Sequence, residues 1–215
     1  MRALRMTLAV TMVLMAAPRS ARAERDSSTP ALLAAGAGMA IPTYLLGVAW
    51  HEGTHALCAS AFGADVFELR LYPSVYQGHF YFGLTRWRGD LTPGEKAFTL
   101  VAPKLTDLVL LGAYTAIVAA DALPDNDYGA LALTVLATGA WVDFAKDVFS
   151  VNPTNDLMKV HALYGHTSEW QRLPWRLVQG ALSAAAGLVL YVGYTDVFAA
   201  KTSDTMLLQV YAGTF

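Results

Sequence analysis

The segment HEGTH, residues 51–55, places two histidines and a glutamate where their side chains can act together. His51 and His55 are four residues apart, so on a helix they lie on the same face, with Glu52 beside them. The pattern HExxH is typical of zinc hydrolases, in which the imidazoles bind the metal and the glutamate takes a proton from a metal-bound water. The metal lowers the pKa of that water from about 15.7 to about 7. We therefore predict one zinc ion bound by His51 and His55, with Glu52 as the catalytic base.

The residues around this motif are strongly apolar, as the stretch GVAWHEGTHALCASAFG over residues 47–63 shows. Ionisable side chains at membrane depth cost several kcal/mol unless they pair, line water or bind something. A bound metal would supply that compensation. The alternative is a chance match, in which the histidines are ordinary helix-surface residues.

The motif by itself is one ligand short, because a catalytic zinc usually has three protein ligands and a water. The third histidine of the extended soluble-protease motif is absent, since Ala61 stands at its position. We expect Asp156, in VNPTNDLMKV, to supply the third ligand, because Pro153 would break the helix there and irregular backbone at membrane depth is tolerated where it lines a cavity. The alternatives are that NPTND is an ordinary turn, or that a histidine is the ligand. His161 and His166 are less suitable, since a spacing of five takes them off one helical face.

Three further polar residues near this segment have two readings each. Asn152 either donates a hydrogen bond to a developing oxyanion, as a catalytic residue, or forms a helix C-terminal turn. Asp143 and Asp147 share a helix face with Lys146 nearby; they either compete as metal ligands or form a buried ion pair that faces the bundle, and we expect the ion pair.

The composition favours a membrane protein over a soluble one. The 215 residues are 55% hydrophobic and only 15% charged, whereas a soluble domain has about 25% charged residues. Four apolar segments have about the 20 residues that a bilayer core requires, at residues 30–62, 97–120, 128–151 and 174–200. We predict an all-α polytopic membrane protein in which residues 24–215 form a single metalloprotease-like domain. Residues 1–23 resemble a signal peptide, with Arg2 and Arg5 before a short apolar core and ARA at a cleavage position; the alternative is an uncleaved anchor.

Two other features concern the loops. Alternating VFELRLY and aromatic HFYFGL, with turn residues Pro73 and Gly78 between them, predict a short β-hairpin at the membrane face. The loops after the first and third spans are basic, whereas DALPDND after the second span is acidic, so the basic loops are expected in the cytoplasm. The net charge of −2 without a basic stripe excludes nucleic-acid binding, and the single Cys58 excludes an intramolecular disulfide.

Taken in order, three segments resemble motifs of the site-2 proteases, which are polytopic zinc metalloproteases that cut inside the membrane. HEGTH matches the HExxH of this family, and LVAPKLTDLVLLG is similar to its A-G-P-x-x-N motif, with Pro103 at the proline, and Ala102 and Asp107 roughly where glycine and asparagine are usual. NPTND is similar to the segment whose aspartate completes the zinc site, although the usual L-D-G is here Asn155-Asp156-Leu157. The similarity covers residues 45–160 and suggests a small member without the inserted peptide-binding domain of some relatives.

The resemblance implies a zinc-dependent endopeptidase that hydrolyses peptide bonds of membrane-spanning substrates. Its ligands would be His51, His55 and Asp156, its base Glu52, and its partners the lipid bilayer and a membrane protein or transmembrane peptide. The signal and the compact polytopic body suggest a bacterial inner membrane with the active site toward the cytoplasm. Two alternatives remain, a non-catalytic membrane protein that binds a metal or partner and a zinc hydrolase of a non-peptide substrate. The sequence leaves the oligomeric state open.

Overall fold

A computed structural model describes residues 27–198 of the chain. Its elements are helix α2 (Thr29–Ala61), strands β1 (Asp65–Arg70), β2 (Ser74–Tyr76), β3 (His79–Tyr81) and β4 (Leu84–Arg88), and helices α3 (Pro93–Ala119), α4 (Asp127–Ala145), α5 (Asp156–Leu163) and α6 (Glu169–Phe198). The predicted signal segment, residues 1–23, lies outside the described residues.

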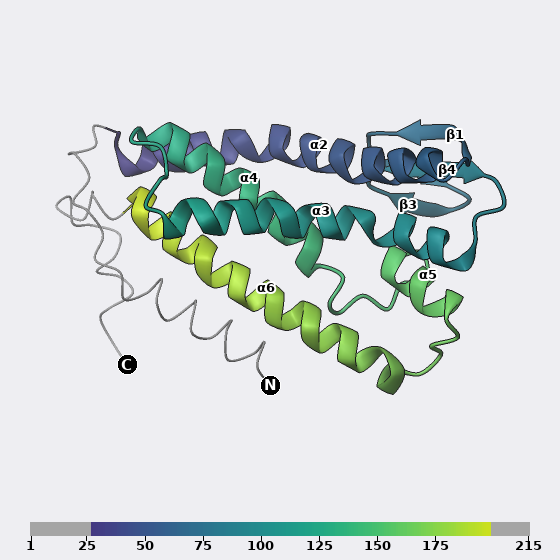
Figure 1. The fold of residues 1–215 in the computed structure, drawn as a ribbon. Coiled ribbons are helices and arrows are strands. Elements are labelled where there is room, and N and C mark those ends of the chain that lie inside the picture. Colours follow the sequence, from purple (N-terminus) through teal and green to yellow (C-terminus); the bar gives the residue numbers. More distant parts are fainter. Residues whose placement is uncertain (1–26, 199–215) are drawn as a thin grey trace.

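The prediction of four long apolar segments is confirmed: they form helices α2, α3, α4 and α6, and each is long and apolar enough to cross a membrane. They run side by side, with the strands and α5 at one end (Figure 1). The third span is shorter than predicted: α4 ends at Ala145 rather than at residue 151. The residues that follow form a turn and then the separate helix α5, which the sequence did not predict.

Local signals explain where the helices begin. Thr92, just before Pro93, and Glu95 in the first turn form a capping box, which satisfies two free backbone N–H groups at the start of α3. Asn126 and Asn155 are the N-caps of α4 and α5, and each side chain accepts a hydrogen bond from the first turn. These caps fix where the chain leaves each loop.

The interior of the bundle is apolar, and so is much of its outer surface. A buried cluster joins all four long helices; it includes Leu32, Tyr114, Leu131, Val189 and Val192. Large apolar side chains also point outward, since Ile41, Leu57 and Val109 are each about 70% exposed. Exposure of this kind along several helices is expected where lipid, rather than water, surrounds the protein.

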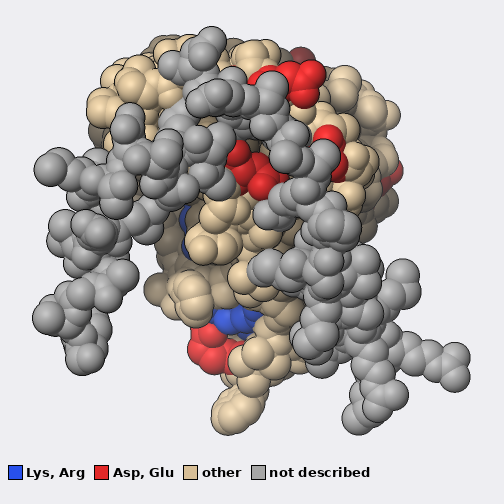
Figure 2. Space-filling model, turned by 90° about the vertical axis from the view of Figure 1, so that its left-hand side faces the viewer, with Lys and Arg blue, Asp and Glu red and all other residues tan. Residues whose placement is uncertain are grey.

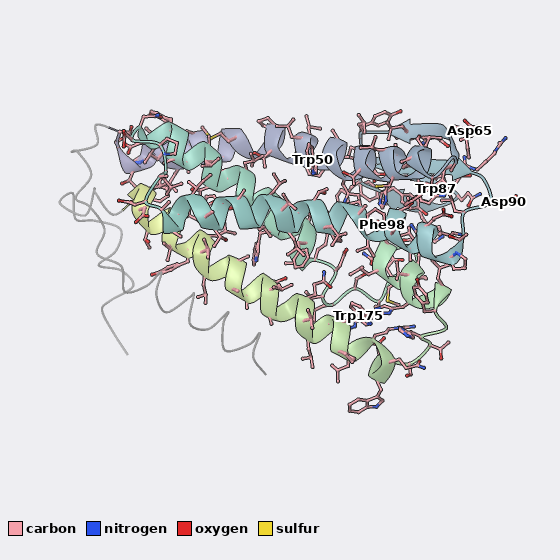
Figure 3. All side chains as sticks on the ribbon, in the orientation of Figure 1. Trp50, Asp65, Trp87, Asp90, Phe98 and Trp175 are labelled. Carbon is pink, nitrogen blue, oxygen red and sulfur yellow. The ribbon has the colours of Figure 1, made fainter. Side chains whose placement is uncertain are left out.

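The short hairpin predicted between the first two spans is also confirmed, and it consists of two antiparallel pairs. β1 pairs with β4, with Asp65 opposite Arg88 and Arg70 opposite Leu84, while β2 pairs with β3 beyond them. Figure 3 shows Trp87 of β4 at the same end of the bundle as Asp65, Asp90 and Phe98. We call the segment from β1 to β4 the hairpin; both β1 and β4 contact α2.

Candidate metal centre

The last turns of α2 hold the three residues of the HExxH motif. The rings of His51 and His55 lie edge to face, with 4.9 Å between their centroids. His55 is buried and His51 is half-buried, so both are shielded by the surrounding helices. The helical spacing thus places the two imidazoles together, as the sequence predicted.

Asp156 joins these histidines from the first position of α5. The Asn155 side chain caps this helix by accepting a 3.0 Å hydrogen bond from the N–H of Leu157. The Oδ2 atom of Asp156 lies 3.3 Å from Nε2 of His51 and 3.1 Å from Nε2 of His55. The structure therefore brings Asp156 to two histidines that precede it by 105 and 101 residues in the sequence.

Nδ1 of each imidazole already makes a hydrogen bond, and this determines the protonation of the Nε2 atom that faces Asp156. Nδ1 of His55 lies 2.7 Å from the carbonyl of Thr99, and Nδ1 of His51 lies 2.8 Å from Oδ2 of Asp143. A carbonyl or a carboxylate only accepts, so each Nδ1 must carry the proton and donate it. In the neutral ring Nε2 then presents a lone pair.

With both rings neutral, two Nε2 lone pairs and a carboxylate oxygen converge and repel one another. The positive charge that this arrangement needs comes from a bound cation or from a proton on an imidazole, which then donates to Asp156. Their ligand atoms all lie within 4.8 Å of one another. In a tetrahedral site with bonds of about 2.0–2.2 Å, neighbouring ligand atoms would be roughly 3.3–3.5 Å apart. The three residues thus fit a divalent cation with nitrogen and oxygen ligands.

The carboxyl group of Asp156 is held in its charged form. Its burial would by itself raise the pKa, but hydrogen bonds that His51 and His55 donate to the carboxylate when their Nε2 atoms are protonated outweigh this and hold the pKa well below its usual range. Lys159 adds a contact of 2.8 Å from Nζ to Oδ1. An ionised aspartate is the form that can bind a metal.

The hairpin covers the glutamate of the motif. The Thr85 hydroxyl donates a 2.6 Å hydrogen bond to Oε2 of Glu52, and it also lies 3.0 Å from the backbone oxygen of Glu52. A Cβ atom on Gly83 would come within 2.5 Å of Cγ of Glu52, so this position has no room for a side chain. Two positions further along β4 from Thr85, the Trp87 ring lies 6.2 Å from the ring of His55. One face of β4 therefore lies against Glu52 and His55.

A buried group of charges lies behind His51. Lys104 of α3 contacts Oδ2 of Asp143 at 2.8 Å and Oδ2 of Asp147 at 3.0 Å. The prediction of a buried ion pair at Asp143 and Asp147 is thus confirmed, although their shared partner is Lys104. Lys146 contacts Asp143 alone, from the exposed side. Asp143 also accepts a hydrogen bond from Nδ1 of His51, a contact that the sequence did not reveal.

The remaining candidates lie elsewhere. Asn152 is exposed in the turn between α4 and α5, where its Oδ1 accepts hydrogen bonds from the N–H and the hydroxyl of Thr154. Its role in stabilising an oxyanion stays a prediction. His161 and His166 face each other, with 3.1 Å between their Nδ1 atoms. They line a cavity of about 340 Å³ between α3, α5 and α6, whose lining also includes Lys104 and Asp147, and they are not in the group formed by Asp156 and the α2 histidines.

Sequence reasoning missed Thr85, Gly83 and Lys104. A lysine within an apolar span is itself a signal, because such a charge needs a partner at that depth. Thr85 and Gly83 carry no comparable signal, since their importance depends on how the hairpin folds onto α2.

Comparison of the chain with protein-family models, with curated proteins and with solved structures finds no match in any of the three. The case for a function therefore depends on the geometry of this centre and on its setting among four apolar helices.

Proposed function

We propose that the protein is a zinc-dependent intramembrane endopeptidase. One observation carries this proposal: the side chains of His51, His55 and Asp156 converge next to Glu52, within a bundle of helices long enough to span a membrane. Metal ligands beside a glutamate are the components of hydrolysis by an activated water. The resemblance of HEGTH, LVAPKL and NPTND to site-2 protease motifs supports the choice of a peptide substrate.

His51, His55 and Asp156 would hold the zinc ion, since two imidazoles and a carboxylate are a common ligand set for catalytic zinc. When bound, zinc supplies a Lewis acid that activates water and polarises the scissile carbonyl. Asp143 and the Thr99 carbonyl keep Nδ1 of each histidine protonated, so that each Nε2 is directed at the metal position.

Glu52 acts as the general base and then as the general acid in this proposal. Its carboxylate takes the proton of the attacking water and passes it to the amine that leaves as the peptide bond breaks. The hydrogen bond from Thr85 fixes the orientation of the carboxylate before reaction. Glu52 is half-buried beneath the hairpin, so water and substrate must approach beside β4.

The setting suggests how a substrate would bind and which way the protein is oriented. In the described part of the chain, β1 pairs with β4 alone, and an unwound peptide adding to its other edge would gain backbone hydrogen bonds. Acidic side chains (red) lie at the end of the bundle opposite the strands, where the loop of residues 120–126 carries Asp121 and Asp125 (Figure 2). The loop of residues 120–126 carries no Lys or Arg, whereas the loops at the strand end carry several. The positive-inside rule therefore favours a metal centre toward the cytoplasm, in what we propose is a bacterial inner membrane.

The test is Glu52→Gln in the full chain, purified and reconstituted with a doubly labelled single-span peptide. We expect cleavage to be abolished while bound zinc, measured by elemental analysis, stays at one ion per chain. Glu169→Gln, which changes an exposed glutamate at the start of α6, is the matched control and should cleave like the wild type.

The other outcomes identify the alternatives. Full activity in Glu52→Gln would reject the proposed mechanism. Zinc bound by the wild type without any hydrolysis would favour a non-catalytic metal-binding membrane protein. Cleavage of ester or amide probes, but of no peptide, would favour a zinc hydrolase of another substrate.

A further inference from the structure

Lys104 is a buried charge in the middle of an apolar helix. Its side chain is 4% exposed, and α3 is one of the four helices able to span a membrane. A lysine in such a place costs free energy unless it is paired and serves a purpose. The contacts of its ammonium group show two connections to the metal centre.

The first connection leads to His51. Nζ of Lys104 donates to Oδ2 of Asp143 at 2.8 Å and to the backbone oxygen of Asp143 at 2.6 Å. The same Oδ2 atom accepts the 2.8 Å hydrogen bond from Nδ1 of His51. Lys104 therefore fixes the carboxylate that sets the tautomer and the ring orientation of one metal ligand.

The second connection leads to Asp156. Nζ of Lys104 lies 3.0 Å from Oδ2 of Asp147, and Oδ1 of Asp147 accepts a 2.6 Å hydrogen bond from Nδ2 of Asn155. Asn155 caps α5, so its position sets where that helix begins. Asp156 is the next residue, and its carboxylate reaches the histidines from that first helical position.

We propose that Lys104 is a positioning residue that fixes where His51 on α2 and Asp156 at the start of α5 lie relative to each other in the metal centre. Through Asp143 it orients His51 on α2, and through Asp147 and Asn155 it places the start of α5. The proposal rests on the metal site of the proposed function. It explains why a lysine lies at this depth: one cation on α3 that contacts Asp143 and Asp147 links α2, α4 and the start of α5. The carboxylate of Asp107 lies 4.0 Å from the same Nζ atom.

The competing explanation is that Lys104 only neutralises buried aspartates and so stabilises the fold. Lys146 allows the positioning role and the purely structural role to be distinguished. It contacts the same Asp143 from the exposed side and does not reach Asp147. A purely structural lysine would change the stability of the metal-free protein without changing the metal affinity of the molecules that fold.

The experiment measures zinc affinity by competition with a chromophoric chelator, using the full chain in lipid nanodiscs. We expect Lys104→Met to weaken zinc binding by about ten- to a hundredfold, as loss of groups that orient metal ligands does. Lys146→Met should change it by less than about fivefold, the value of a surface ion pair. The visible spectrum of the cobalt-substituted protein should change in Lys104→Met and not in Lys146→Met, because the spectrum reports ligand geometry.

If Lys104→Met does not fold, the same measurements are made on Asp147→Asn. This substitution keeps the side-chain volume and weakens the ion pair with Lys104. Zinc affinity and cobalt spectra like those of the wild type in either folded variant would overturn the positioning role and leave the endopeptidase proposal intact. A wild-type protein that binds no zinc would overturn both. Loss of activity in Glu52→Gln with normal zinc binding supports the proposed function, whether or not the Lys104 variant changes zinc affinity.

Discussion

The Thr85 hydroxyl donates a 2.6 Å hydrogen bond to the carboxylate of Glu52, although the two residues are 33 positions apart and lie on β4 and α2. The hairpin is therefore part of the candidate active site and not merely a connection between two spans. It covers the carboxylate of Glu52, which is half-buried.

Replacement of Thr85 by valine removes this hydrogen bond and keeps the shape of the side chain. A hydrogen bond to a charged group contributes about 1.5–3 kcal/mol, so we expect kcat/KM for peptide cleavage to fall at least about tenfold. Zinc content should not change, because Thr85 touches no metal ligand. Thr115→Val is the control, since Thr115 bonds only to the backbone of its own helix. Equal losses in both variants would argue against a specific role for Thr85.

Replacement of Gly83 by alanine tests the close packing over the base. The added methyl group would lie 2.5 Å from Cγ of Glu52 and 2.8 Å from Cγ1 of Val48, so the base or the hairpin must move. A displacement of about 1 Å costs roughly a hundredfold in rate, and we expect a fall of this size with zinc still bound. Gly53→Ala is the comparison, because within residues 27–198 no atom other than the neighbouring backbone of α2 lies within 4 Å of its Cβ position. That variant should remain active, and it should melt at the same or a higher temperature.

Replacement of Asp156 by alanine should remove a metal ligand. We expect zinc affinity to fall by more than about a hundredfold, which exceeds the usual effect of a residue outside the ligand shell. Titration with zinc, read by elemental analysis after gel filtration, measures this. Asp90→Ala changes an exposed aspartate at the same end of the molecule and should bind zinc normally. Unchanged zinc occupancy in Asp156→Ala would mean that a histidine is the third ligand.

Acidification should loosen the hairpin through Glu68. Hydrogen bonds from Arg86 and Arg70 lower the pKa of this carboxyl group below its ordinary value of 4.5. A group with a depressed folded pKa stabilises the fold above its unfolded pKa, and that contribution is lost as the pH falls through the lower folded value. We expect the amides of β1 and β4 to lose protection below a pH of about 4.5, after correction for the intrinsic effect of pH on exchange.

Glu68→Gln provides the control for this pH effect. The variant should have weaker protection of β1 and β4 at neutral pH and no further loss from this group on acidification. A wild-type hairpin whose protection is independent of pH would show that the two arginine contacts contribute nothing to its stability.

The sequence by itself determined the parts of this protein that depend on neighbouring residues. The lengths and apolar character of the spans, the helical spacing of His51 and His55, and the strand character of the hairpin are all local properties, and the structure has each of them. The end of the third span was less well determined, because apolar residues continue to Val151 while the helix ends at Ala145. Hydropathy indicates which residues can lie in lipid, but it does not indicate where the backbone hydrogen bonds of the helix end.

Only the tertiary structure decided which distant groups meet. The sequence offered Asp156 among other candidates, but its 3.1 Å approach to His55 depends on the turn after α4 and on the cap at Asn155. The contact of Thr85 with Glu52 had no equivalent in the pattern of residues. A lysine in an apolar span indicated that Lys104 needs a partner, but not that Asp143 and Asp147 are the partners. Such contacts depend on how elements pack, and packing results from many weak apolar contacts summed over the bundle rather than from any single motif.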